Sequence, residues 1–224
     1  MKISRYFDAA VLKPEMTREE AKDAIRQSIE ADSYSVCVRG CDIPMAVEMC
    51  RGTNTLVSCV LDFPYGYGGA AGKRALAKVY CQQGAKELDM VMNYGYARGG
   101  DWDVVEEEIR GVCEEAHAAG ALVKVIFETS QLTLDQIRTA TETAIRAGAD
   151  FVKTSTGFNG AGATKEAVRA MLETAAGRAR VKPSGGIRDY ATAKMYVDMG
   201  AQRLGIGFSS AAAIARGEGT DEAY

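Results

Sequence analysis

The chain has 224 residues, of which 47% are hydrophobic, and its 27 Lys and Arg against 30 Asp and Glu give a formal net charge of −3. This is the balance of an ordinary globular protein with a sizeable core, without the basic excess of a nucleic-acid-binding protein. No apolar run reaches the ~18–20 residues of a membrane span and the N-terminus is not a signal peptide, so we expect no membrane association and a cytoplasmic location.

Short β-type runs alternate with longer helical patterns along the chain. Thr17 and Thr133 are each followed three residues on by Glu or Gln, a capping-box spacing that predicts helix starts. The patterns predict strands at 6–12, 34–38, 56–63, 87–92, 122–127, 151–153, 181–183 and 203–206. They predict helices at 17–31, 43–50, 72–83, 102–119, 133–147, 164–176, 190–199 and 209–216.

Eight strand–helix units in one chain predict parallel βαβ connections and, most naturally, a closed (β/α)8 TIM barrel. A doubly wound open sheet is the alternative. It would place a glycine-rich loop after the first strand, and Val11-Leu12-Lys13-Pro14-Glu15 is not one. No linker or low-complexity stretch interrupts the chain, so we expect residues 1–224 to form a single domain.

The barrel places functional side chains at the C-terminal ends of strands or in the loops that follow. The candidate residues in or near such positions are Asp8, Cys37, Asp62, Asp89, Lys124, Lys153, Lys182 and the pair Gly185-Gly186. A buried carboxylate among buried amines compensates their charges, so a purely structural ion-pair cluster is one interpretation of this set.

Lys153 follows the apolar residues Ala149, Phe151 and Val152 and precedes the polar segment Thr154-Ser155-Thr156-Gly157. An ammonium group is costly to bury unless it is paired or loses its proton. An amine with a depressed pKa is a nucleophile toward carbonyls and forms Schiff bases. The alternative is a strand-end lysine that snorkels to solvent.

The six cysteines do not form a metal-site pattern. Cys37 and Cys41 are four residues apart, but no second pair matches them, and the single histidine, His117, is distant in sequence. We therefore expect no metal site, and reduced thiols.

Four segments together resemble the motifs of the deoxyribose-phosphate aldolase family. They are Gly-Ala-Lys-Glu-Leu-Asp-Met-Val at 84–91, Val-Lys-Val-Ile-Phe-Glu-Thr at 123–129, Gly-Ala-Asp-Phe-Val-Lys-Thr-Ser-Thr-Gly-Phe at 148–158 and Val-Lys-Pro-Ser-Gly-Gly-Ile-Arg at 181–188. The resemblance runs from Asp8 to about Gly217.

The resemblance implies a class I aldolase on a TIM barrel. Such an enzyme needs no metal or other cofactor, because its intermediate is a covalent imine on lysine. It reversibly cleaves 2-deoxy-D-ribose 5-phosphate to acetaldehyde and D-glyceraldehyde 3-phosphate. By similarity, Lys153 is the Schiff-base lysine, Lys182 lies beside it, and Asp89 carries protons with Lys182 and a water. The implied supporting residues are Lys124, Asp8, Thr156 and Cys37. Backbone amides at glycine-rich turns would bind the substrate phosphate; the implied positions are Gly157, Gly185, Gly186, Gly207 and Ser209.

The sequence departs from the family pattern at the rim. The first strand, usually Asp-His-Thr-Leu-Leu, is Asp8-Ala9-Ala10-Val11-Leu12, and the usual Arg-Ile-Gly-Thr-Ser of the eighth strand is replaced by residues 203–210, Arg-Leu-Gly-Ile-Gly-Phe-Ser-Ser. Either a two-residue insertion shifts the serines or their role is lost. Two alternatives therefore stay open: the same imine chemistry on a different, non-phosphorylated aldol substrate, or a non-catalytic barrel that binds a sugar phosphate.

Two further expectations come from the resemblance. Family members are often homodimers, and some end in a tyrosine whose tail reaches the active site. Tyr224 either has this role or is part of a frayed terminus.

Overall fold

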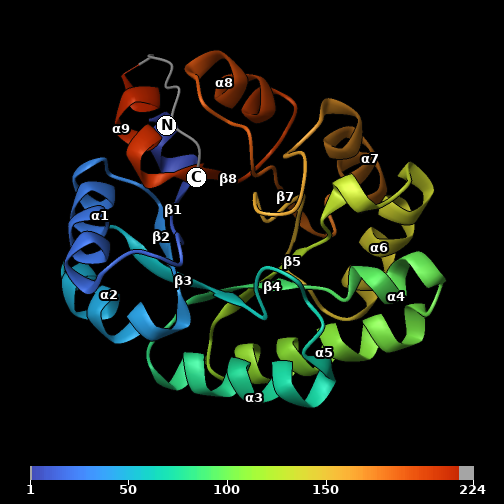
Figure 1. Cartoon of the computed structure of the whole chain (residues 1–224). Helices are drawn as coiled ribbons and strands as arrows, with labels where there is room; N and C mark the ends of the chain where they lie inside the picture. The colour runs from blue at the N-terminus through green and yellow to red at the C-terminus, as the bar shows by residue number, and fades with distance from the viewer. Residues whose placement is uncertain (1, 217–224) are drawn as a thin grey trace.

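Eight parallel strands lie side by side in one sheet in the computed structural model, which describes residues 2–216. The sheet runs in the order β7-β6-β5-β4-β3-β2-β1-β8 (Figure 1). The strands are β1 (Phe7–Val11), β2 (Ser35–Val38), β3 (Leu56–Leu61), β4 (Glu87–Val91), β5 (Leu122–Ile126), β6 (Phe151–Lys153), β7 (Arg180–Lys182) and β8 (Leu204–Gly207).

The sheet curls until its two ends meet. A parallel bridge joins Ser184 to Gly205 between the ends of β7 and β8, and the Gly205 amide donates to the Pro183 carbonyl at 2.9 Å. The predicted TIM barrel is therefore confirmed, and the open-sheet alternative is wrong. The single-domain prediction for residues 1–224 extends beyond the described residues and stays a prediction.

Helices surround the barrel, and α1 lies against α9, which brings the two ends of the ring together (Figure 1). The helices are α1 (Arg18–Glu30), α2 (Ile43–Cys50), α3 (Gly69–Gln82), α4 (Tyr94–Gly99), α5 (Trp102–Ala118), α6 (Leu134–Arg146), α7 (Lys165–Ala175), α8 (Tyr190–Asp198) and α9 (Phe208–Ala215). Short 3-10 turns cover Ile3–Tyr6, Gly40–Asp42 and Thr129–Gln131. Between residues 2 and 216, no helix is both long enough and apolar enough to span a bilayer.

Capping explains several helix boundaries. Thr17 and Thr133 form the two predicted capping boxes, with Glu20 and Gln136 as their partners. The sequence patterns missed α4. This six-residue helix begins where the Asn93 side chain accepts the Tyr96 amide at 3.1 Å, and it ends at Gly100 in the left-handed region. Its existence depends on these local caps rather than on an apolar stripe.

The hydrophobic core lies between the outer faces of the strands and the helices, as Val36, Leu88 and Val123 illustrate with no exposed surface. The barrel interior is different, because polar side chains alternate with the apolar ones along the strands. In β4, for example, Glu87 and Asp89 face inward on either side of Leu88, and both are fully buried. The fold thus places charged groups where a barrel is ordinarily packed with aliphatic residues.

Candidate active site

One connected set of ion pairs occupies the barrel interior. Asp89 is at its centre: Oδ2 accepts from Lys153 Nζ at 2.8 Å and from Lys182 Nζ at 2.7 Å, and Oδ1 accepts from Lys124 Nζ at 2.8 Å. The barrel register explains this meeting, because Lys153 pairs with Lys182 on β7 while Lys124 pairs with Asp89 on β4. The structure therefore brings together the three predicted catalytic side chains.

Asp8 joins this set through two of the lysines, Lys182 and Lys124. Asp8 Oδ2 is 2.6 Å from Lys182 Nζ and 3.2 Å from Lys124 Nζ. The expectation that Asp8, Asp89 and Lys124 lie near the C-terminal ends of their strands is wrong, because each lies within its strand and points into the barrel. Asp8 is the second residue of β1, opposite Ser35, whose hydroxyl donates to it at 2.8 Å. Asp8 therefore stabilises the ammonium groups of Lys182 and Lys124 by ion pairing.

Two members of the set were missed by the sequence analysis. Glu87 accepts from Lys124 Nζ at 2.5 Å, and Arg203 Nη2 lies 3.5 Å from Glu87. Arg203 also stacks on Tyr34, with its guanidinium carbon 3.3 Å from the ring centroid. The period of two was the available signal, because Glu87 is two residues before Asp89 and so shares its face of the strand.

The buried set contains four basic side chains and three carboxylates. The carboxylates are Asp8, Glu87 and Asp89, and the basic groups are Lys124, Lys153, Lys182 and Arg203. With every group ionised, the buried set carries one excess positive charge. Loss of one proton from a lysine makes it neutral. Because an uncompensated charge is costly in a dry interior, the arrangement favours one free amine.

Among the three lysines, Lys153 is the one whose pKa is lowered. Burial lowers the pKa of Lys153, the Lys182 ammonium lowers it further, and Asp89 opposes the change without reversing it. Burial would also lower the pKa of Lys182, but Asp8 and Asp89 overcome this and raise it. Two lysines on neighbouring strands thus have opposite shifts, which is how a fold separates a nucleophile from an acid.

The remaining ionised partners are held in their charged forms. Burial favours the neutral form of Asp8 and Asp89, but the surrounding ammonium groups prevail. Lys124 and Lys182 lower the pKa of Asp8 to about 2, and Lys124, Lys153 and Lys182 hold the pKa of Asp89 well below its usual range. Lys124 has a raised pKa despite its burial, because Asp8, Asp89 and Glu87 surround it.

Cys37 lies close enough to these charged groups for them to shift the pKa of its thiol. Burial raises the pKa of its thiol, and the Asp89 carboxylate adds to the increase. The thiol is therefore protonated at neutral pH and is not an activated nucleophile. It packs with Ala10, Leu12 and Val60 in a small apolar cluster of its own.

Thr156 has a different partner from the lysines. Its hydroxyl donates to Glu128 Oε2 at 2.5 Å and its amide donates to Oε1 at 3.2 Å, while its hydroxyl oxygen accepts from the Phe158 amide at 3.0 Å. Glu128 is fully buried two residues after the end of β5, with φ at 55°, a left-handed conformation that is uncommon outside glycine. Glu128 therefore fixes the loop after Lys153.

The predicted phosphate-binding positions fall in two places. Gly157 and Gly185 approach closely: a Cβ added to Gly185 would lie 3.6 Å from Gly157 Cα and 2.8 Å from Gly162 Cα. Gly207 and Ser209 lie instead beside Ala10 and Phe158, with Gly207 at the N-cap of α9. Gly186 is exposed with φ at 77°. Between residues 2 and 216, no His, Cys, Asp and Glu side chains are grouped as a metal site.

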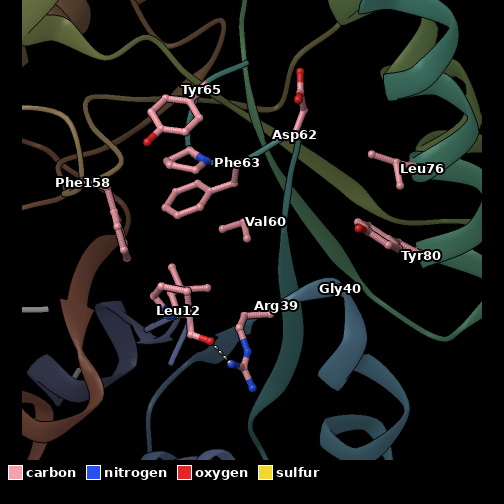
Figure 2. Close-up of a pocket in the computed structure, with 12 residues that line it drawn as sticks. Leu12, Arg39, Gly40, Val60, Asp62, Phe63, Tyr65, Leu76, Tyr80 and Phe158 are labelled. Atoms are coloured by element: carbon pink, nitrogen blue, oxygen red, sulfur yellow. Dashed lines mark hydrogen bonds between the residues drawn. The ribbon is translucent and has the colours of Figure 1, made fainter. Parts of the chain in front are cut away.

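The loops after β3 and β6 meet across the barrel mouth. The rings of Phe63 and Phe158 pack edge to face with centroids 5.1 Å apart, and Asn159 Nδ2 donates to the Pro64 carbonyl at 3.1 Å. Beside this contact is a cavity of about 500 Å³, lined by Leu12, Pro14, Arg39, Gly40, Val60, Asp62, Phe63, Pro64, Tyr65, Leu76, Tyr80 and Phe158 (Figure 2). It lies at the C-terminal face, where barrel enzymes bind their substrates.

Comparisons with known proteins agree with the fold. A family model described as DeoC/LacD family aldolase matches residues 6–215. A deoxyribose-phosphate aldolase of Exiguobacterium sp. (strain ATCC BAA-1283 / AT1b) is 41% identical over 225 residues, with 100% of both chains covered. The solved structure of QR15, an aldolase, matches with a TM-score of 0.90 and 38% identity, covering 96% of this chain and 95% of the other.

A more distant match is the tetrameric deoxyribose phosphate aldolase of Aeropyrum pernix, with a TM-score of 0.87, 27% identity, and coverage of 96% and 89%. The fold and these matches define a TIM-barrel aldolase, a lyase that breaks carbon–carbon bonds. The chain belongs to the DeoC/LacD family of aldolases.

Proposed function

We propose that the chain reversibly cleaves 2-deoxy-D-ribose 5-phosphate to acetaldehyde and D-glyceraldehyde 3-phosphate through an imine on Lys153. The observation that carries the proposal is the contrast between a buried lysine with a lowered pKa and a second lysine, joined to it through Asp89, with a raised pKa. The names of relatives about 40% identical over the whole chain support the choice of substrate.

In the cleavage direction, the neutral Lys153 amine attacks C1 of the open-chain aldehyde. The resulting carbinolamine loses water and becomes a protonated imine. A base then removes the proton of the C3 hydroxyl, the C2–C3 bond breaks, and its electron pair moves into the imine to form an enamine. D-Glyceraldehyde 3-phosphate leaves, C2 gains a proton, and water releases acetaldehyde and the free amine. The imine is the electron sink, so no free carbanion forms.

Lys182 and Asp89 are suited to move these protons. Lys182 holds its proton at neutral pH and is able to protonate the departing carbinolamine oxygen. Asp89 is ionised and accepts hydrogen bonds from both lysines, so a water between Asp89 and the substrate would complete the path. Lys124 and Asp8 hold Asp89 and Lys182 in place through ion pairs. None of these steps requires a cofactor.

The phosphate is expected at the β7–β8 side of the mouth. Gly157, Gly185 and Gly186 supply backbone amides there, with Gly207 and Ser209 at the start of α9. The hollow between Phe158 and Gly207 measures about 10 Å³, room for about one water. Phe158, whose side chain is 37% exposed, would therefore turn outward when the phosphate binds.

The assembly and location of the protein also stay proposals. A homodimer is expected from the family resemblance, while one relative is described as tetrameric. Light scattering of the purified chain distinguishes monomer, dimer and tetramer. A cytoplasmic location stays a prediction.

Reductive trapping tests the proposed chemistry. Acetaldehyde and borohydride should give a stable adduct that peptide mass spectrometry places on Lys153, and Lys153→Met should abolish both this adduct and turnover of 2-deoxyribose 5-phosphate. A chain that binds the sugar phosphate without forming the adduct, under conditions that label an authentic aldolase, would be a non-catalytic binding barrel. Turnover of deoxyribose as efficient as that of its 5-phosphate would show that the phosphate is not required.

A further inference from the structure

Arg203 lies at the N-terminal end of the barrel, opposite the reactive amine. It comes immediately before β8, whereas Lys153 is the last residue of β6, and parallel strands begin at one end of a barrel and finish at the other. Arg203 is 6% exposed, and its guanidinium carbon lies 3.3 Å from the centroid of the Tyr34 ring and 5.4 Å from that of Phe151. Its charge is therefore shielded from water and fixed in place.

One series of ion pairs leads from Arg203 to the reactive amine through Glu87. Nη2 of Arg203 lies 3.5 Å from Glu87 Oε1, and Glu87 accepts from Lys124 Nζ at 2.5 Å. Lys124 also donates to Asp89 at 2.8 Å, and Asp89 accepts from Lys153 at 2.8 Å. Direct contacts between opposite charges thus connect the two ends of the barrel.

A second series of ion pairs runs through Asp8. Nε of Arg203 lies 3.5 Å from Asp8 Oδ1, and Asp8 Oδ2 lies 2.6 Å from Lys182 Nζ. Lys182 donates at 2.7 Å to the same Asp89 oxygen that accepts from Lys153. Arg203 therefore shares the carboxylates that it contacts with the buried lysines.

The basic groups of this set differ in whether they can lose a proton. A guanidinium group stays protonated in proteins, whereas a buried ammonium group can become neutral. Arg203 therefore always compensates the equivalent of one negative charge of the three carboxylates, Asp8, Glu87 and Asp89. Two negative charges remain for three lysines, so the neutral form of one lysine costs less free energy than its charged form in a dry interior.

The contacts indicate which lysine becomes neutral. Lys124 lies within 3.2 Å of three carboxylates, and Lys182 lies within 2.7 Å of two. Among residues 2–216, Lys153 forms an ion pair with Asp89 alone. The pKa shifts agree with the contacts, because the pKa of Lys153 is lowered and those of the other two lysines are raised.

We propose that Arg203 is a positioning residue for the reaction, whose permanent charge keeps Lys153 in the neutral, nucleophilic form through the two series of ion pairs. The inference rests on the proposed imine chemistry of Lys153. Arg203 does not contact the substrate in this role. It compensates negative charge that would otherwise stabilise a third ammonium group, and it acts from the end of the barrel opposite the substrate.

Other titratable groups also lie near Lys153 or Arg203. Besides the members of the set, they are Cys37 on β2, Glu128 after β5, Tyr34 before β2 and Arg180 on β7. The first two act on Lys153, and the last two pack on the same aromatic rings as Arg203 or form them. None of the four is changed in the variants that test the charge of the set.

Two substitutions should move the titration of Lys153 in opposite directions. Arg203→Met leaves three lysines with three carboxylates, so Lys153 keeps its proton to a higher pH. Glu87→Gln removes a negative charge, so Lys153 loses its proton at a lower pH. We expect each pH profile to shift by about one unit. The double variant R203M/E87Q regains the original excess of one positive charge, and its profile should return close to that of the unmodified chain.

Two measurements follow the protonation of Lys153. The pH dependence of kcat/KM for 2-deoxyribose 5-phosphate reports the free enzyme. The rate of Lys153 acetylation by acetic anhydride, located by peptide mass spectrometry, reports the free amine without turnover. Arg180→Met is the matched control, because Arg180 stacks on Phe151 at 4.0 Å but is 41% exposed and pairs with Asp150 outside the set. It should shift neither profile.

The outcomes separate the inference from the proposed function. Profiles of R203M and E87Q that stay in place, or that move in the same direction, overturn the role of Arg203, while an acetaldehyde adduct on Lys153 leaves the proposed function intact. Arg203→Gln, which keeps a donor for Glu87, replaces R203M if R203M does not fold, and the downward shift of E87Q is required in either case. Failure to form the Lys153 adduct overturns the proposed function, whatever the acetylation profiles show.

Discussion

The barrel interior and the barrel mouth differ in how their groups are satisfied. Inside, each carboxylate and ammonium group is fixed by partners of opposite charge, and Asp89 alone contacts three lysines. At the mouth, a cavity with mainly aromatic and aliphatic walls lies beside the edge-to-face contact of Phe63 with Phe158. The interior therefore sets which bond chemistry is available, while the mouth sets which molecules reach it.

The difference also concerns tolerance to change. Removing one partner from a buried ionic set leaves an uncompensated charge in a dry environment. Removing part of an apolar wall changes only volume and contact area. Substitutions in the interior should thus alter rate and stability together, whereas substitutions at the mouth should alter substrate preference.

The largest expected effect comes from Lys182→Met. The substitution removes the ammonium that lowers the pKa of Lys153 and leaves the remaining buried charges balanced with Lys153 protonated. We expect kcat/KM at neutral pH to fall by about 10²–10⁴. Because the pKa of Lys153 rises when a like charge is removed, the rise in activity with pH should move to higher pH.

Lys194→Met is the matched control for this experiment, since Lys194 forms an exposed pair with Asp198 on α8. It should leave both rate and pH profile unchanged. A pH profile of K182M that rises at the same pH as that of the unmodified chain would show that Lys182 does not tune Lys153.

The next effect concerns stability. Lys124 Nζ contacts three carboxylates, at 2.5 Å from Glu87, 2.8 Å from Asp89 and 3.2 Å from Asp8. Lys124→Met should lower the free energy of unfolding by about 3–5 kcal/mol, because three negative charges lose their shared partner. Urea unfolding followed by circular dichroism measures the change.

A second substitution sharpens this prediction. In K124M, Asp8 and Asp89 keep Lys182 as a partner, whereas Glu87 keeps only Arg203 at 3.5 Å. Adding Glu87→Gln removes that poorly paired carboxylate, so the double variant should be more stable than K124M alone. Strictly additive losses would mean that Lys124 and Glu87 act independently, contrary to their contact.

The barrel and its reactive centre could be predicted because both depend on regular repeats. Eight strand–helix units fix the topology, and register then places Lys153 beside Lys182. The alternation of side chains along β4 also predicts that Glu87 faces the barrel interior, although only Asp89 was named from this strand. Asp8 was expected near the C-terminal end of its strand although the predicted strand at 6–12 already placed it close to the start, as β1 does.

The mouth could not be predicted in the same way. The contact of Phe63 with Phe158 joins two loops 95 residues apart in sequence, and a similar loop-to-loop bond joins Asn159 to Pro64. Loop conformation depends on individual turns and buried anchors such as Lys73, which leave no periodic pattern in the sequence. Helix α4 was missed for the same reason, since local caps define it.

The smallest expected effect concerns Glu128, a buried residue that connects the barrel interior to the mouth. Glu128 accepts two hydrogen bonds from Thr156, and Thr156 in turn accepts from the Phe158 amide, so a buried carboxylate holds a residue of the mouth. Glu128→Gln keeps the size but removes the charge, at a cost of roughly 1 kcal/mol. We expect kcat/KM for 2-deoxyribose 5-phosphate to fall about fivefold.

The pH dependence separates this role from simple structural damage. Burial raises the pKa of Glu128, so in the unmodified chain KM should increase as the pH falls and the carboxylate gains a proton. The variant has no such proton to gain, and its KM should lose that component of the pH dependence. Glu142→Gln, which alters an exposed pair with Arg178, should retain it. If E128Q keeps the full pH dependence, another group produces it, and Glu128 holds the loop without sensing pH.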